Sequence, residues 1–202
     1  MSLQHFGVEF TPRRKADRPW IEETFWKLVD KTRIASGGDF KKQRNLLIEE
    51  LILLSVDEIL ALESVMYNLM DNAYHADLWD AASIINCGCG DDGFEDFRAW
   101  LIAQGKDVYE KALVDPESLV NLIKTNERAR DEDFLYVSMI AHERKTGQVL
   151  PARADKERPR LRGVHWSQEI RKERFPKLAA KFGDCDQRES IWDVGDIEPD
   201  EF

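Results

Sequence analysis

The chain has 202 residues, enough for one domain or two small ones, and 43% of them are hydrophobic, so it can bury a substantial core. Its formal net charge of −10 disfavours general nucleic-acid binding, which depends on a basic face that neutralises phosphates. The sequence contains no apolar run of about 18 residues, so we expect no membrane-spanning segment.

The cysteine count and the first residues set further expectations. Three cysteines, an odd number without the spacing of a disulfide framework, indicate a reducing compartment, so we expect a cytoplasmic protein. Residues 1–20 lack the long apolar core of a signal peptide and are expected to form an extended arm. A helical domain is expected over residues 21–183, followed by an acidic tail over residues 184–202.

Apolar residues recur at helical spacing along most of the chain. The predicted helices, in chain order, cover residues 21–36, 40–54, 56–75, 78–86, 93–104, 106–114, 116–123, 131–146 and 168–175, and a last turn and a half follows over residues 176–182. No run of residues alternates as a half-buried strand would, and no internal repeat is present. We therefore predict an all-α fold of about nine helices around one core.

Several helix ends carry local signals. Asp39 and Ser167 are expected N-caps, and Ser55 with Glu58 three positions later forms a capping box. Asp115 followed by a proline predicts a helix start. Gly147 predicts a helix end, because glycine readily adopts the left-handed conformation found there.

Charge is unevenly distributed near the C-terminus. Residues 153–174 are rich in arginine and lysine, whereas residues 184–202 are rich in aspartate and glutamate. One interpretation is two solvated segments that attract each other. The other is an acidic tail that binds a basic partner.

The stretch "DLWDAASIINCGCGDDGFEDFRAWLIAQG", residues 77–105, concentrates polar groups between apolar helices. Its two cysteines, Cys87 and Cys89, lack the second pair that a zinc site needs, so we expect no metal and no cofactor. A bond between two cysteines separated by one residue would be strained. Both thiols are therefore expected to be reduced and unbonded.

The acids and the arginine of this stretch allow two interpretations. Asp91 or Asp92 is expected to cap the helix that begins near Gly93, although paired carboxylates also suit a hard cation or acid–base chemistry. Arg98, which shares a helix face with apolar residues, is expected to bond the carboxylate of Asp77 or Asp92. If that pair is buried and satisfied, the motif is architectural.

The alternative is a ligand clamp. Arg98 would then face an open pocket and hold a substrate carboxylate or phosphate, with Trp79 and Trp100 as its walls. Asn86 belongs to the same candidate set, although an asparagine near a helix end is most often a cap or turn former.

Three segments of this stretch, "DLWDAASIIN", "GDDGF" and "FRAWLIAQG", resemble an uncharacterised bacterial family, the domain of unknown function forty-two forty. The resemblance extends to "FWKLVDKTR", "FLYVSMIAHERKTGQVLP" and "GVHWSQEIRKERFPKLAAKF", and so covers residues 23–182. It implies no activity.

The resemblance also marks departures from the family pattern. Cys87 stands where the family usually has glycine, Gly90 where it often has serine, and His142 where tyrosine is usual. These departures argue against an essential shared role for the three residues.

Two functional hypotheses follow. The preferred one is a helical module that binds a protein partner or regulates one, without catalysis, because no recognised nucleophile, metal or phosphate motif is present. The alternative is a small-ligand-binding protein or enzyme whose site uses residues of the central stretch. The oligomeric state is not predicted.

Overall fold

The computed structural model describes residues 18–150 and 159–185, and these ranges are predominantly helical. They contain nine α-helices and two 3-10 helices, and the isolated bridge between His75 and Arg162 is their one extended pairing. The predicted all-α fold is therefore confirmed. Most of the expected arm and tail lies outside the described residues, and the arm is shorter than expected because the first helix already begins at Arg18.

By its internal contacts the chain divides into two compact units. Unit 1 comprises residues 1–68 and 136–153, and unit 2 comprises residues 69–135 and 154–202. A single helical domain over residues 21–183 would include both units, and its boundaries stay a prediction.

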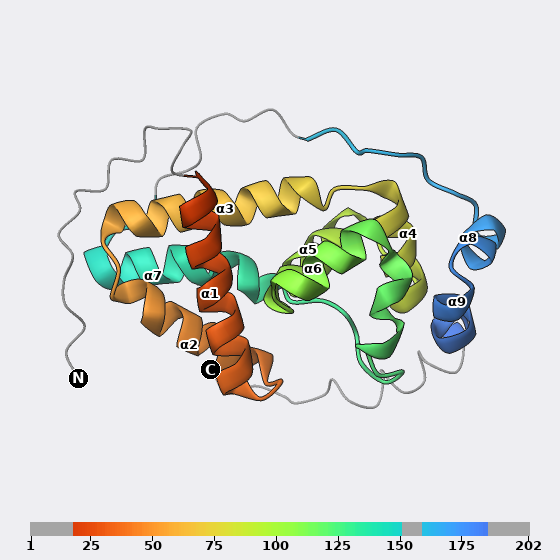
Figure 1. The fold of residues 1–202 in the computed structure, drawn as a ribbon, viewed down its shortest axis with the longest axis horizontal. Helices are drawn as coiled ribbons and strands as arrows, with labels where there is room; N and C mark the ends of the chain where they lie inside the picture. The colour runs from red at the N-terminus through yellow and green to blue at the C-terminus, as the bar shows by residue number, and fades with distance from the viewer. Residues whose placement is uncertain (1–17, 151–158, 186–202) are drawn as a thin grey trace. The chain divides into compact units, whose positions relative to one another are not determined.

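Unit 1 is built from α1 (Arg18–Ser36), α2 (Phe40–Ile52), most of α3 (Val56–Asn72) and α7 (Val137–Thr146). Helix α2 packs against both α1 and α7 (Figure 1). The apolar stripes of these helices supply the buried side chains Phe25, Trp26, Val29, Leu47, Ile48, Leu51, Ile59, Leu62, Met66, Val137 and Ala141.

The helix ends of unit 1 follow the local signals. The Asp39 side chain accepts a hydrogen bond from the Lys42 amide at 2.9 Å. In the capping box, the Ser55 amide donates to Glu58 Oε2 at 2.7 Å and the Glu58 amide donates to Ser55 Oγ at 3.3 Å. Gly147 ends α7 with a φ of 72°, a left-handed conformation that glycine adopts without steric cost.

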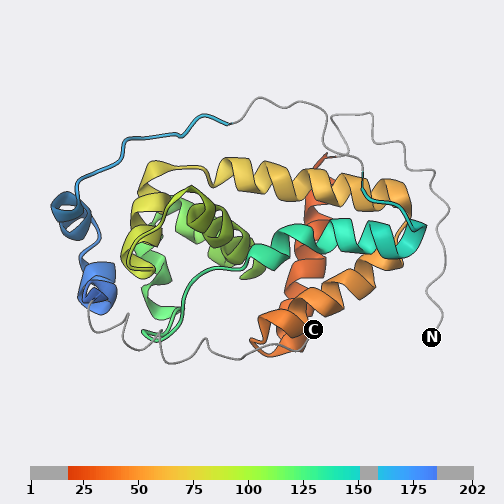
Figure 2. The same ribbon diagram turned by 180° about the vertical axis from the view of Figure 1, so that it is seen from behind.

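Unit 2 contains α4 (Ala76–Ile85), α5 (Asp91–Ala103), α6 (Lys106–Val114), α8 (Gln168–Arg174), α9 (Pro176–Phe182) and the 3-10 helix η2 (Pro116–Asn121). Helix α4 is its central element, since it contacts α5, α8, α9 and η2. Both views in Figures 1 and 2 show α8 and α9 beside α4. The buried core of this unit includes Leu78, Ala81, Ala82, Ile85, Phe94, Phe97, Leu101, Ile102, Leu178 and Phe182.

Two predicted α-helices are replaced in whole or in part by 3-10 turns. The segment after Asp115 forms η2, because the Asp115 side chain accepts from the amide of Glu117 only two residues on, which starts a tighter turn. The predicted helix over residues 131–146 is likewise divided into the 3-10 helix η3 (Glu132–Tyr136) and α7.

The C-terminal end of α3 is closed by side chains that are distant in sequence. The last carbonyls of a helix lack partners within the helix. Here Arg98 Nη1 donates to the carbonyl of Met70 at 2.8 Å, and Tyr109 Oη donates to that of Leu69 at 2.7 Å. Arg162 donates to the carbonyl of Asn72. Two cations therefore lie at the negative end of the helix dipole, where they are favoured.

Arg98 is thus buried and satisfied without a carboxylate. Only 8% of the residue is exposed, Nε donates to the Phe94 carbonyl at 3.2 Å, and the guanidinium lies over the rings of Tyr74 and Phe94 at 4.9 and 5.0 Å. Burial lowers the pKa of its guanidinium. The predicted bond to Asp77 or Asp92 is wrong, because backbone carbonyls supply the acceptors instead.

We predict that Arg98→Met lowers the free energy of unfolding by about 2–3 kcal/mol, because it leaves the Met70 carbonyl buried without its charged donor. Urea denaturation followed by circular dichroism measures the loss. The same change at the exposed Arg144 is the matched control and is expected to cost under about 1 kcal/mol. Equal losses in the two variants would contradict the closing role of Arg98.

Candidate functional site

A buried carboxylate on α4 organises the most polar region of unit 2. Asp80 is completely buried, yet it accepts hydrogen bonds from His165 Nδ1 at 2.9 Å and from the Trp166 amide at 3.1 Å. Arg171 Nε lies 2.8 Å from the same carboxylate in an ion pair. A charge without access to water needs such partners, so Asp80 holds α8 and the preceding segment, residues 159–167, against α4. We call residues 159–167 the strap.

A second acid lies one turn earlier on the same face of α4. Asp77 accepts from Arg174 Nη2 at 2.9 Å and from Trp166 Nε1 at 3.4 Å. The Arg174 guanidinium also lies 4.8 Å from the centroid of the Trp166 ring. Two acids on α4 therefore meet two arginines one turn apart on α8, and the Asp77 pair is the more exposed of the two.

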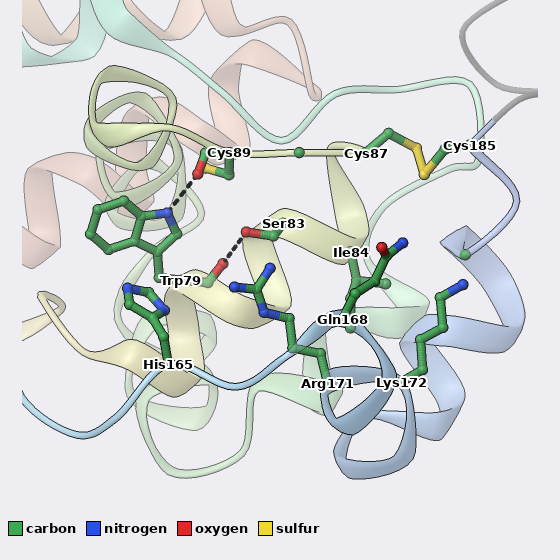
Figure 3. A pocket seen from close by; sticks show the side chains of 12 residues that line it. Trp79, Ser83, Ile84, Cys87, Cys89, His165, Gln168, Arg171, Lys172 and Cys185 are labelled. Atoms are coloured by element: carbon green, nitrogen blue, oxygen red, sulfur yellow. Dashed lines mark hydrogen bonds between the residues drawn. A yellow bond between two sulfur atoms is a disulfide. The ribbon is translucent and has the colours of Figure 1, made fainter.

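A pocket of about 640 Å³ lies beside these pairs. Its walls come from α4, the loop that follows α4, the strap, α8 and the segment after α9 (Figure 3). The residues that line it include Trp79, Ser83, His165, Gln168, Arg171 and Lys172.

The pocket is basic on one side. Arg171, Lys172 and His165 line it, and no acidic side chain is among the described residues that do so. Asp80, which pairs with Arg171, does not line the pocket. Glu169 lies one turn before Lys172 in the first turn of α8. Its carboxyl accepts hydrogen bonds from its own amide and from Ser167, and these hold the pKa of the carboxyl below the usual range.

Trp79 forms a rigid aromatic wall of the pocket. Its Nε1 donates to the carbonyl of Cys89 at 2.7 Å, and its ring stacks on Phe94 with centroids 4.6 Å apart. The ring of His165 meets it edge-on at 4.9 Å. Because both its polar and apolar contacts are satisfied, Trp79 presents a fixed surface to the pocket.

The seven residues predicted for a site do not converge. Trp79 lines the pocket, and Asp77 borders a separate hollow of about 200 Å³. Trp100 is 4% exposed and belongs to the core. Asn86 is structural, since its side chain both donates to and accepts from the backbone of Ala129 at 3.1 and 2.9 Å. With Arg98 closing α3, the clamp predicted from the central stretch is not formed.

Asp91 and Asp92 do not cap α5 with their side chains. The helix begins two residues earlier than predicted, so Gly90 is the N-cap and both acids lie exposed in the first turn. There they interact favourably with the positive end of the helix dipole.

The thiols differ from the prediction in one respect. Cys87 is bonded to Cys185, 98 positions later, so the expectation that Cys87 is free is wrong. Sequence spacing could not show this pairing, because it depends on α9 packing on α4. Cys89 is free, as predicted, and burial raises the pKa of its thiol to about 12.

Four residues of the pocket region were missed by sequence reasoning. They are Asp80, His165, Arg171 and Lys172. The available signal was the pair of acids one turn apart in "DLWDAA" together with a matching pair of arginines in "HWSQEIRKER". Each half alone is typical of a solvated helix face.

The described helices lack the combination of length and apolar character that a membrane crossing requires. Within the described ranges, no three histidine, cysteine, aspartate or glutamate side chains gather as a metal ion would need.

The fold and the pocket define an all-α protein with a basic, aromatic-walled pocket. The chain belongs to the family described as "Protein of unknown function (DUF4240)", whose match covers residues 21–144. That range includes α4 and α5 but ends before the strap and α8, short of the extent to residue 182 that the resemblance implied. No curated protein and no solved structure matches the chain.

We predict that Asp80→Asn lowers the free energy of unfolding by about 2–3 kcal/mol. The substitution removes the negative charge that pairs with Arg171 and that accepts two hydrogen bonds. Asp77→Asn is the matched comparison, and its more exposed pair is expected to contribute under about 1 kcal/mol. Urea denaturation measures the loss of unfolding free energy in both variants, and hydrogen exchange over residues 165–174 should rise more in Asp80→Asn. Equal effects would contradict the central role of Asp80.

We also predict that Cys89 resists alkylation. A thiol pKa of about 12 leaves it protonated at pH 8, so iodoacetamide should react roughly a thousandfold more slowly than with a cysteine of ordinary pKa. Mass spectrometry of the unreduced protein measures the rate, and the same protein in urea is the control. Ordinary reactivity in the folded protein would refute the prediction.

Proposed function

We propose that the chain binds a small anionic ligand, a carboxylate or a phosphate, in the pocket between α4 and α8. The observation that carries the proposal is the presence of Arg171 and Lys172 on a pocket surface whose described lining includes no acid. Because Arg171 already pairs with Asp80 through its Nε edge, Lys172 and the remaining donors of Arg171 are the groups that suit a ligand bringing its own negative charge.

The size and the walls of the pocket narrow the class of ligand. A volume of about 640 Å³ is within the range typical of small-molecule sites. Trp79 supplies a flat apolar surface beside the cations, so a ligand with both a planar group and an acid uses both features. Arg171 is preorganised, because the ion pair with Asp80 holds its Nε edge.

The arrangement favours binding over covalent catalysis. His165 donates through Nδ1 to a carboxylate, an orientation that general bases share. However, the hydroxyl of Ser83 donates to the Trp79 carbonyl at 2.9 Å, and the Cys89 thiol is protonated, so neither is an activated nucleophile.

The role preferred from the sequence, a protein-interaction or regulatory module, stays a prediction, as does a cytoplasmic location. The pocket supports the small-ligand role because it supplies a defined set of donors for an anion.

We predict that phenyl phosphate raises the melting temperature of the protein, whereas benzyl alcohol has less effect and benzylamine has none. At a hundred times its dissociation constant, such a ligand adds about 2.7 kcal/mol to stability. Lys172→Gln should weaken the effect of phenyl phosphate, because it removes one cation from the pocket.

The matched control is Lys111→Gln, an exposed lysine of α6 that does not line the pocket. It should leave the response to phenyl phosphate unchanged. Equal responses to all three compounds, or equal losses in the two variants, would overturn the proposal.

A further inference from the structure

The disulfide lies on the same pocket as the cations. Cys87 and Cys185 both line it, and Figure 3 shows their bond on the side away from Trp79 and His165. Cys87 follows α4 and Cys185 follows α9, so the bond connects two walls of one pocket. An anion drawn into the pocket by Arg171 and Lys172 therefore arrives beside a sulfur–sulfur bond.

The fold keeps the two cysteines close independently of the bond. Their Cα atoms are 5.4 Å apart, within the range that a disulfide needs. The loop that carries Cys87 is anchored by the two hydrogen bonds between Asn86 and Ala129, and α9 packs on α4. These contacts do not involve sulfur, so the reduced pair stays positioned to form the bond again.

The surroundings favour exchange at this pair. Positive charge stabilises thiolates, which are the reactive species in thiol–disulfide exchange. The neighbouring Cys89 does not compete, since its thiol stays protonated well above neutral pH and its carbonyl is engaged by Trp79.

We propose that Cys87 and Cys185 form a reversible redox pair that exchanges with a small anionic thiol, a thiol that carries a carboxylate, guided into the pocket by Arg171 and Lys172. The proposal rests on the proposed function, because the same cations are assigned to the anion.

The exchange balances with the small thiol as the reductant. Its thiolate attacks one cysteine sulfur, the sulfur–sulfur bond breaks, and the other cysteine leaves as a thiolate that takes up a proton. A second small thiolate attacks the small-molecule sulfur of this mixed disulfide and releases the remaining cysteine, which is also protonated. Two electrons pass to the protein, and the two small thiols become one small disulfide.

The test compares three thiols of different charge on the oxidised full-length chain. The probes are 3-mercaptopropionate, which is anionic, 2-mercaptoethanol, which is neutral, and cysteamine, which is cationic. Each reduction rate, followed by alkylation and mass spectrometry, is divided by the rate of that thiol with a small neutral disulfide. This ratio removes differences in intrinsic reactivity.

We expect 3-mercaptopropionate to be favoured over 2-mercaptoethanol by roughly tenfold, and cysteamine to be disfavoured, because a charged cleft concentrates ligands of opposite charge. Lys172→Gln should abolish most of this preference, whereas Lys111→Gln should retain it. High salt should reduce the preference in the wild-type chain.

Two results would overturn the proposal. One is the absence of a Cys87–Cys185 linkage in tryptic peptides of the oxidised chain. The other is an equal normalised rate for all three thiols. If phenyl phosphate still binds in a Lys172-dependent manner in either case, the proposed function stands and only the redox role fails.

Discussion

The buried carboxylate of Asp80 is the constraint on which the pocket depends. An ionised group with no exposure is tolerated only when donors replace the water it has lost. Two hydrogen bonds come from the strap, from His165 and the Trp166 amide, and an ion pair with Arg171 of α8 adds a compensating charge. Satisfying one charge therefore draws a segment more than eighty residues away in sequence onto α4, and that segment supplies the basic wall of the pocket.

Arg98 shows the opposite solution to the same problem. It is a buried cation, yet its acceptors are the carbonyls of Met70 and Phe94, together with two aromatic faces. Because the end of α3 already supplies negative partial charge, no carboxylate is needed there. Asp77 is consequently available to Arg174, and the acids of α4 are directed to α8 rather than to α5.

The accuracy of the sequence-based predictions depends on how far apart the interacting residues lie. Helix starts at Asp39, Ser55 and Ser167 were predictable, because each cap involves an amide within a few residues. The all-α class followed from spacing alone. The start of α5 was missed by two residues, since a glycine N-cap leaves no side-chain signal.

The candidate site was predictable only in part, because its residues meet through tertiary packing. The sequence indicated Trp79 as a site residue but grouped it with Arg98 and Trp100. In the structure Trp79 lines the pocket, Trp100 is buried in the core, and Arg98 donates to the end of α3. The basic residues of α8 were interpreted as a solvated segment. Nothing local distinguishes an arginine that faces water from one that meets a buried acid on a helix far away in sequence.

The charged side chains among the described residues that line the pocket are basic, whereas the net charge of the chain is negative. A net charge of −10 repels anions at long range, yet Arg171 and Lys172 lie on the pocket surface itself. At physiological ionic strength the screening length is about 8 Å, so distant acids contribute little to the potential inside the pocket, which is set by Arg171 with its partner Asp80 and by Lys172. Adding salt consequently has two opposed effects, since it weakens both the distant repulsion and the local attraction. The local term is the larger one for a ligand already seated beside Arg171, because interactions shielded from solvent are screened least. The proposed preference of the pocket for anions is therefore compatible with the negative net charge of the chain.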